Sequence, residues 1–296
     1  MKPPSFRRQV CRARLSLVAA LVTLAACGQA EVDEGGSSTT DGAVCLQGGP
    51  FAAGGGIEVG AGGPGASSRA GTTGDVADRV GRLRWHRYDG CERFVMDLVD
   101  GAGEAVAGSG AVSAEVLRDL GVVRVTLRDV AGAEPDATDA TFAGPLARAA
   151  YAVASPEGPW VYVDLHLGDA AEAAVSTLRD PARVVVDLRP GGGRVPPPAP
   201  SETRVVVLTP RPGPATYPLT VTGYARTFES NVVVRLEREG QEVHEDFTTA
   251  TAWLDAWGHY SFTIADGPAA RVVLHVGEYS ARDGTWEGVA VPLDMR

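Results

Sequence analysis

A strict alternation of apolar and polar residues over 161–167 constrains the fold more than any other feature. The segment reads Val-Tyr-Val-Asp-Leu-His-Leu, so aliphatic side chains occupy every second position. Successive side chains of a β-strand point to opposite faces, and the spacing therefore predicts a half-buried strand. Residues 93–98, 122–128 and 183–188 repeat the pattern. Several such strands need a second layer to cover their apolar faces, which predicts a β-sandwich or a related two-layer β fold.

Residues 169–178 leave two alternatives open. The segment is rich in alanine, which favours a short helix, but it also reads as a loop followed by a strand. Pro181 lies just beyond it and would end any helix.

The C-terminal third of the chain predicts a second all-β domain. Short apolar runs are separated there by turn residues, at 219–223, 231–236, 259–264, 271–276 and 289–293. Glu239-Gly240 marks a hairpin between two of the strands. About seven short strands without a convincing helix indicate an immunoglobulin-like sandwich.

The N-terminus reads as a targeting segment. A start rich in arginine precedes an apolar run over 15–26, which is too short for a permanent membrane span. The sequence Leu24-Ala25-Ala26-Cys27 that follows resembles the lipobox of bacterial lipoproteins. The resemblance implies that the signal peptide, residues 1–26, is removed and that Cys27 receives a diacylglyceryl group. A plain cleaved signal with an incidental cysteine is the alternative. We therefore expect a lipid-anchored protein on the extracytoplasmic face of the cell membrane.

Charge narrows the choice of partners. The chain has 27 Lys and Arg residues against 37 Asp and Glu, a formal net charge of −10, and the leader contains no acidic residue. An acidic protein is poorly suited to bind nucleic acid or an anionic bilayer. We expect no nucleic-acid partner, and contact with the membrane through the lipid alone.

Composition divides the remainder of the chain. Residues 27–74 are rich in Gly, Ala, Ser and Thr and predict a flexible tether after the lipidated cysteine. Residues 191–202 combine glycines with a proline run, which predicts a hinge and a stiff linker. The two domains then cover residues 75–190 and 203–296, and their relative pose should vary unless they bury a joint surface.

Two of the four cysteines remain once the leader and the lipid site are assigned. Cys11 lies in the leader, and Cys27 is the lipid site. Cys45 and Cys91 form an even pair in an oxidising compartment, so a disulfide is expected. Two free thiols are the alternative.

A family resemblance covers residues 75–190. The segments 91–98, 123–127 and 160–165 occur in order before Asp-Pro-Ala-Arg-Val-Val-Val-Asp-Leu at 180–188. Together they resemble the AMIN-like domain of actinobacterial envelope proteins. The resemblance implies a β-sandwich and an association with peptidoglycan or another wall polysaccharide.

The polar positions of these strands suggest two interpretations. They could form one glycan-binding sheet face, or they could be a solvated face with cross-strand ion pairs, which we favour. The residues concerned are Arg93, Asp97, Tyr162, Asp164, His166, Arg183 and Asp187. Trp85 and Trp160 are expected in the core.

A second resemblance covers residues 203–296. The segment 218–232, followed by Tyr-Ser-Ala-Arg-Asp-Gly at 279–284, closely resembles the Gmad2 immunoglobulin-like domain of bacterial spore-germination and envelope proteins. Within these motifs Glu229 and Asp283 could hold a cation, and Arg282 could clamp a carboxylate. We favour the interpretation that Phe228, Glu229, Arg282 and Asp283 fix turns, with Glu229 paired to Arg282.

No catalytic signature is apparent. The sequence has no His-Glu-x-x-His, no Gly-x-Ser-x-Gly, no phosphate-binding glycine loop and no EF-hand loop, and its five histidines are scattered. We expect no enzyme activity, no cofactor and no metal. The sequence favours a non-catalytic envelope-binding lipoprotein whose immunoglobulin-like domain contacts an envelope protein. A structural spacer, or an assembly or germination factor without glycan affinity, is the alternative, and a wall hydrolase is a distant third.

Overall fold

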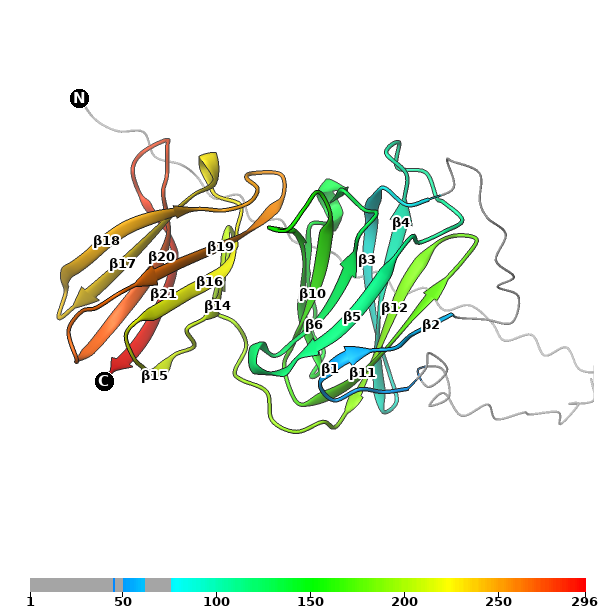
Figure 1. Cartoon of the computed structure of the whole chain (residues 1–296), viewed down its shortest axis with the longest axis horizontal. Helices are drawn as coiled ribbons and strands as arrows, with labels where there is room; N and C mark the ends of the chain where they lie inside the picture. The colour runs from blue at the N-terminus through cyan, green and yellow to red at the C-terminus, as the bar shows by residue number, and fades with distance from the viewer. Residues whose placement is uncertain (1–44, 46–49, 62–75) are drawn as a thin grey trace, which may run out of the picture. The chain divides into compact units, whose positions relative to one another are not determined.

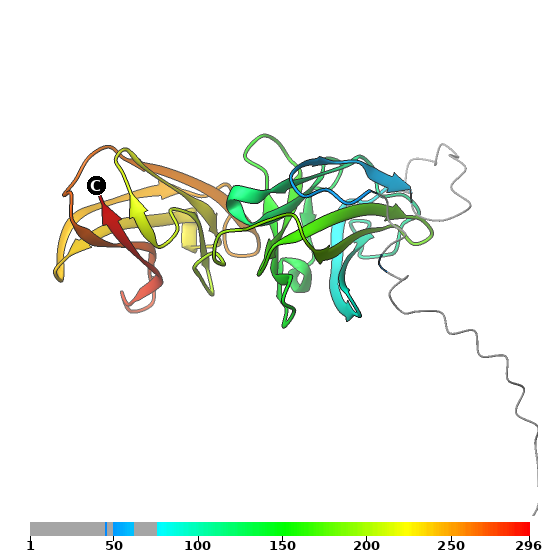
Figure 2. The ribbon, with the colours of Figure 1, turned by 90° about the horizontal axis from the view of Figure 1, so that it is seen from below.

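The computed structural model describes Cys45, residues 50–61 and residues 76–296. The expected signal peptide and Cys27 lie outside these residues. The described chain is almost entirely β-strand with short 3₁₀ turns, so the predicted all-β class is confirmed (Figures 1 and 2). Among the helices of this part, none has the length and apolar character needed to cross a membrane.

The N-terminal sandwich consists of two sheets. In the first, the strand order is β1-β5-β6-β10-β9, and β8 pairs with β9. The bounds are β1 (Gly55–Ile57), β5 (Val112–Leu117), β6 (Val122–Leu127), β8 (Asp139–Thr141), β9 (Ala147–Ala154) and β10 (Val161–Leu167). In the second sheet the order is β2-β11-β12-β4-β3-β7. Its strands are β2 (Val59–Ala61), β3 (Arg79–Tyr88), β4 (Cys91–Val99), β7 (Gly132–Ala133), β11 (Ala171–Leu178) and β12 (Arg183–Pro190).

The core between these sheets follows the alternation of the sequence. Val163 and Leu165 of β10 face Phe94 and Met96 of β4 within one cluster of buried side chains. The segment with two open interpretations, residues 169–178, is a loop followed by β11, so the helical alternative is wrong. β11 pairs along its whole length with β12, and these ladder hydrogen bonds override the helical preference of alanine.

Residues 55–61 lie within the range expected to be a tether, yet they form β1 and β2. β1 pairs with β5, and β2 runs parallel to β11. Ile57 is buried in the core of the sandwich. The backbone hydrogen bonds between neighbouring strands do not require large side chains. A glycine-rich segment can therefore extend a sheet when one apolar residue is buried with it.

The C-terminal sandwich consists of two layers of strands. One is a five-stranded sheet in the order β15-β21-β20-β17-β18, and the other is formed by β19, β16, β14 and β13. Their bounds are β13 (Ser201–Glu202), β14 (Val205–Thr209), β15 (Gly213–Ala215), β16 (Leu219–Ala225), β17 (Asn231–Arg238), β18 (Gln241–Thr249), β19 (Trp257–Ile264), β20 (Arg271–Tyr279) and β21 (Trp286–Met295). The predicted hairpin at Glu239-Gly240 joins β17 to β18, and both turn residues have positive φ, 53° and 78°.

The two sandwiches belong to one compact unit and share a sheet. β19 pairs in parallel with β9, where Trp257 lies opposite Val153. Tyr151, Tyr162 and Tyr224 are buried in a separate cluster with these two residues. The expected hinge is also held in place, because Gly191 N–H donates to Ala170 O at 3.2 Å and Val195 packs against the N-terminal core.

Candidate functional site

A cavity of about 570 Å³ lies over the polar face of β5, β6 and β10, and His259 of β19 closes one side of it. Its walls combine basic, acidic, hydroxyl and aromatic side chains. The lining residues are Gly56, Ser113, Ala114, Glu115, Arg124, Thr126, Arg128, Ser155, Pro156, Glu157, Trp160, Tyr162 and His259. The volume is within the range of small-molecule sites, and the mixture of aromatic and polar groups is typical of them. We refer to this site as the arginine–tryptophan cavity.

Two arginine–aromatic pairs form the centre of the cavity wall. The guanidinium of Arg128 lies 5.0 Å from the ring centroid of Trp160, and that of Arg124 lies 4.0 Å from the ring of Tyr162. Both distances permit a cation–π interaction. Trp160 lines the cavity at partial exposure, so the expectation that it belongs to the core is wrong. Trp85, in contrast, packs against the core as expected.

Arg124 is fixed by Asp164, the central residue of β10. Its Nε and Nη2 each donate to a carboxylate oxygen at 2.7 Å, and Asp164 is fully buried. Burial disfavours the charged guanidinium, but the hydrogen bond and charge of Asp164 more than offset it, and the pKa of Arg124 is raised. The hydroxyl of Tyr224, from the C-terminal sandwich, donates to the same carboxylate. Asp164 therefore connects the cavity to both sandwiches.

Tyr162 and His166 flank Asp164 along the strand, and both are buried. Burial raises the pKa of the Tyr162 hydroxyl and lowers the pKa of His166 to about 4. The Tyr162 hydroxyl has no hydrogen-bond partner among the described residues. An unsatisfied buried hydroxyl is costly, and because this one is shielded from solvent it is not a contact for a molecule in the cavity.

His259 also borders the cavity, and burial lowers its pKa. The neutral imidazole can donate and accept one hydrogen bond each. The arrangement can therefore bind a polar ring compound by stacking, by charge-assisted hydrogen bonds from arginine and by neutral hydrogen bonds.

The seven candidate residues do not form one face. Tyr162, Asp164 and His166 belong to the sheet containing β10, whereas the other four belong to the opposite sheet. Of the seven, only Tyr162 lines the cavity. The preferred interpretation, a solvated face, is also wrong for Asp164, His166 and Asp187, all of which are buried. The C-terminal sandwich contributes to burying the first two.

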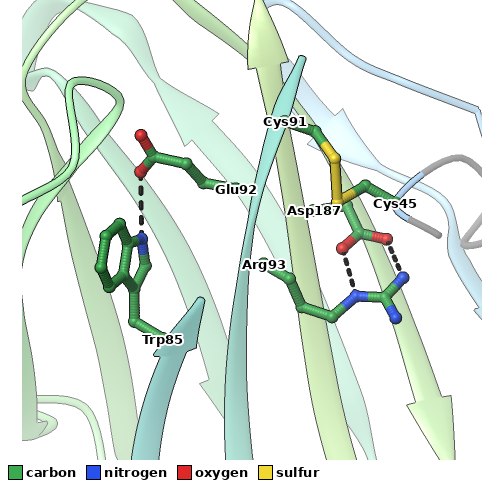
Figure 3. The surroundings of a disulfide bond; sticks show 6 residues. All are labelled: Cys45, Trp85, Cys91, Glu92, Arg93 and Asp187. Atoms are coloured by element: carbon green, nitrogen blue, oxygen red, sulfur yellow. Dashed lines mark hydrogen bonds and ion pairs between the residues drawn. A yellow bond between two sulfur atoms is a disulfide. The ribbon is translucent and has the colours of Figure 1, made fainter. Parts of the chain in front are cut away.

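Of the residues on the opposite sheet, Arg93, Asp187 and Asp97 form cross-strand ion pairs, as the preferred interpretation expected, whereas Arg183 bonds within its own segment. Arg93 Nε and Nη2 donate to the Asp187 carboxylate at 2.7 and 2.8 Å (Figure 3). This hydrogen bond raises the pKa of Arg93. Asp97 pairs with Arg84, and Arg183 Nε donates to the carbonyl oxygen of Pro181 at 3.4 Å.

A disulfide joins Cys45 to Cys91 at the start of β4, with 6.2 Å between the two Cα atoms (Figure 3). The next residue, Glu92, is buried and accepts hydrogen bonds from Trp85 Nε1 at 3.0 Å and from the backbone of Leu146 and Ala147. Because its carboxylate is satisfied by these donors, Glu92 has a structural role.

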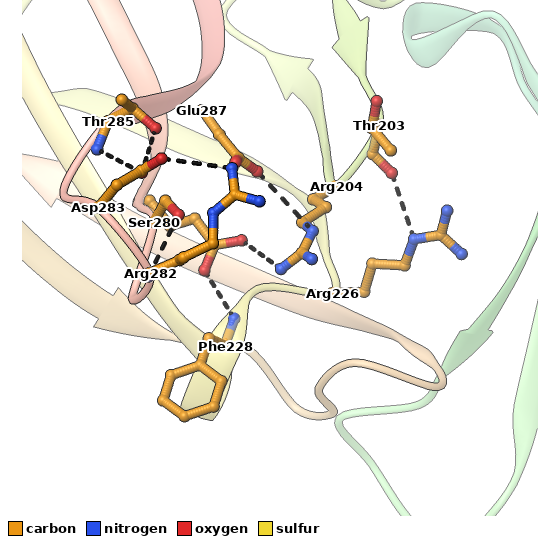
Figure 4. Close-up of polar contacts among 10 residues, drawn as sticks. Thr203, Arg204, Arg226, Phe228, Ser280, Arg282, Asp283, Thr285 and Glu287 are labelled. Atoms are coloured by element: carbon orange, nitrogen blue, oxygen red, sulfur yellow. Dashed lines mark hydrogen bonds and ion pairs between the residues drawn. The ribbon is translucent and has the colours of Figure 1, made fainter.

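The two motifs of the C-terminal sandwich meet at one end of it. The backbone N–H of Phe228 donates to Glu278 at 2.7 Å, and the same carboxylate accepts from Arg204 (Figure 4). Asp283 accepts hydrogen bonds from Thr285, which lower the pKa of Asp283. Arg282 pairs with Asp283 at 3.3 Å, whereas we expected it to pair with Glu229.

These contacts agree with turn-forming roles for the motifs. Glu229 has positive φ within a 3₁₀ turn, and Asp283 closes a loop. Among the described residues there is no group of three or more His, Cys, Asp or Glu side chains arranged to hold a metal ion.

Sequence reasoning missed Arg124 and Arg128 as candidate residues, although the signal was present. Arg124 lies with Thr126 on the polar face of β6, and Arg128 follows the end of the strand at the next alternate position. The alternation shows which residues share a face, but not which strand lies beside it or what covers it. The pairing of β6 with β10 supplies the missing information.

Comparison with protein families locates one match. Residues 204–285 match the model of Gmad2, described as the immunoglobulin-like domain of bacterial spore germination. The search of curated proteins gives no match. The C-terminal sandwich therefore carries the Gmad2 immunoglobulin-like domain that its sequence resembled.

Proposed function

We propose that the protein is an extracytoplasmic lipoprotein that binds a wall polysaccharide, such as the glycan of peptidoglycan, without chemically altering it. In this proposal Cys27 carries the lipid, the N-terminal sandwich binds the polymer, and the Gmad2 domain contacts an envelope protein. The arginine–tryptophan cavity carries the proposal, because it combines a recess with two arginine–aromatic pairs.

The chemistry of the cavity suits a sugar. An aromatic ring such as that of Trp160 offers an apolar face to a pyranose ring, and sugar hydroxyls need several hydrogen-bond partners at fixed positions. Arg128 can donate to ring substituents, and the imidazole of His259 offers one further hydrogen bond. Cell-wall glycans also carry carboxylates, for which an arginine is the preferred donor.

A second candidate function follows from the family match. The Gmad2 domain suggests a module related to spore germination, and a factor of this kind could work through protein contacts without any glycan affinity. The two functions differ in whether the cavity is required.

Co-sedimentation of the full chain with purified peptidoglycan tests the proposal. We expect the protein to pellet with the wall, and Trp160→Ala and Arg128→Ala each to lower the affinity by about tenfold, because both variants remove cavity contacts. Trp253→Ala is the matched control, since Trp253 is an exposed tryptophan of the other sandwich. A wild-type protein that stays in the supernatant at low and high salt would contradict glycan binding and favour the second candidate. A clearing zone in zymography on the same wall would instead indicate a hydrolase.

A further inference from the structure

We propose that three exposed residues of the C-terminal sandwich, Phe228, Trp253 and Leu254, form a docking surface for a lysine- or arginine-bearing segment of a partner protein. We call this surface the aromatic tip. It makes no use of the arginine–tryptophan cavity, so this proposal does not depend on whether the protein binds the wall.

The side chains of the aromatic tip are exposed and adjacent. Phe228 is 41% exposed, Trp253 is 51% exposed and Leu254 is 37% exposed. The two aromatic rings meet edge to face, with 6.2 Å between their centroids. Large apolar side chains scattered singly over a surface need no explanation, but a contiguous exposed group of aromatic residues marks an interaction site. Aromatic residues are also the usual energetic centre of protein interfaces.

The backbone beneath the aromatic tip adopts an unfavourable conformation. Glu229, Ser230 and Leu254 have φ values of 55°, 60° and 49°, a region that side chains other than glycine rarely adopt. Such residues cost free energy and persist where the surrounding structure imposes them. Both loops of the aromatic tip contain them, and in both loops the strained residues adjoin the exposed aromatic side chain.

The base of the aromatic tip is fixed by a buried carboxylate. Glu278 accepts a hydrogen bond from the backbone of Phe228 at 2.7 Å and one from Arg204 at 2.9 Å (Figure 4). Glu278 is only 4% exposed, so this contact is shielded from solvent. A surface held in place before binding loses little conformational entropy when the partner arrives. Glu278, which directly precedes the second Gmad2 motif, thereby helps to position Phe228 of the first motif.

Charge indicates the chemistry of the partner. Exposed Glu229 directly follows Phe228, and exposed Asp255 directly follows Leu254, so carboxylates flank the apolar side chains. The nearby cation Arg282 is already paired with Asp283. A lysine or arginine can pair with the carboxylates and stack on the Trp253 ring. The same acidic residues disfavour an anionic membrane surface as the occupant.

A pair of synthetic peptides provides the test. One alternates Lys and Leu and the other, of equal length, alternates Glu and Leu; binding to the full chain is followed by titration calorimetry. We expect the lysine peptide to bind and the glutamate peptide to bind at least tenfold more weakly. Trp253→Ala and Phe228→Ala should each weaken binding of the lysine peptide by about tenfold, and Glu229→Gln with Asp255→Asn should weaken it several-fold and reduce its salt dependence.

Phe247→Ala is the matched control, because Phe247 is 64% exposed on β18 and lies outside the aromatic tip. The proposal requires this variant to bind like the wild type. Equal affinity for both peptides, or equal loss in Phe247→Ala and Trp253→Ala, would overturn it. So would dimerisation of the full chain that Trp253→Ala abolishes, which would make a second copy the occupant. Trp253-dependent binding to zwitterionic vesicles would assign the surface to a membrane and would likewise overturn it.

Discussion

Asp164 illustrates how one side chain can couple distant parts of the chain. Its carboxylate accepts two hydrogen bonds from Arg124 and one from Tyr224, and it is fully buried. A buried ion pair gains little over an apolar replacement, but losing one partner leaves the other charge buried and unpaired. The contribution of this pair is therefore measured by the cost of breaking it.

We predict that Asp164→Ala lowers the free energy of unfolding by about 3 kcal/mol, because Arg124 and the Tyr224 hydroxyl both lose their acceptor. Asp97→Ala removes a carboxylate that is paired with Arg84 at a partly exposed position. That variant should lose less than about 1 kcal/mol. Urea denaturation of the two variants gives the comparison, and equal losses would show that burial of the Asp164 pair is unimportant.

His166 predicts a dependence of stability on pH. Burial lowers its pKa to about 4, below the ordinary value of 6.5, so the unfolded chain binds a proton that the folded chain excludes. This contribution to stability is complete above pH 6.5 and is lost as the pH falls toward 4. We expect it to amount to about 3 kcal/mol.

Unfolding free energies measured between pH 7 and pH 4 test this prediction. His166→Gln should flatten the curve in part, since burial also lowers the pKa of His259 and His275. His86→Gln, which replaces an exposed histidine, is the matched control. A His166→Gln curve parallel to that of the wild type would show that His166 does not titrate in the expected range.

At the scale of single elements, β1 and β2 show how a glycine-rich segment becomes part of a sheet. The strands join different sheets of the N-terminal sandwich, and the disulfide at Cys45 attaches the chain just before them to β4. By closing a loop of 46 residues, the cross-link restricts the unfolded chain, which by the loop-entropy model stabilises the fold by roughly 3 to 4 kcal/mol.

We predict that Ile57→Ala lowers the free energy of unfolding by about 2 to 4 kcal/mol, as expected for a large-to-small substitution in a core. Ile57 is 7% exposed and belongs to the main hydrophobic cluster. Its neighbour Glu58 is exposed, and Glu58→Ala should change stability by no more than about 0.5 kcal/mol. If both variants matched the wild type, β1 would contribute nothing to the core.

Alternation explains which strands were predictable from the sequence. β10, β4, β12 and β6 each place an apolar residue at every second position, which identifies both the strand and its core face. The sequence does not specify which strands share a sheet, so Asp164 and Asp187 seemed equivalent although they lie on different sheets. The sequence did not predict β1 and β2, because these strands are held by backbone hydrogen bonds to neighbouring strands and by one buried isoleucine. Composition reveals neither feature.

The candidate site was less predictable than the fold for a related reason. Tyr162 was identified from its place on the polar face of β10, and Trp160 lies two residues before it, but Arg128 comes from another segment. Only the folded sheet brings the three residues to one cavity. His259 reaches the same cavity from the other sandwich, and no pattern within a single strand could indicate this.

At the scale of the whole described chain, several different kinds of interaction join the two sandwiches. Asp139 of β8 accepts hydrogen bonds from Arg226 and from Trp257 Nε1, each at 3.1 Å. Arg211 Nη2 donates to the carbonyl oxygen of Leu120 at 2.7 Å. With the shared sheet, these contacts replace the variable pose that the glycine–proline linker alone would suggest.

The contact between the sandwiches predicts that they unfold together in one cooperative transition. A substitution of Val153 tests this prediction. Val153 lies opposite Trp257 and is fully buried in the cluster between the sandwiches, whereas its neighbour Ala152 faces the N-terminal core. Val153→Asp therefore places a charge in the joint without altering that core, and burying an unpaired carboxylate there is costly. We expect the wild type to unfold in one calorimetric transition and the variant in two, with faster proteolysis within residues 191–202.

Val163→Asp is the contrasting variant, because Val163 belongs to the N-terminal core. It should unfold the N-terminal sandwich outright and not separate two folded domains. A Val153→Asp protein that still unfolds in a single transition, with only a lower midpoint, would mean that the sandwiches remain coupled without the buried cluster. The shared β9–β19 pairing and the polar contacts of Asp139 would then be sufficient to hold the two sandwiches together.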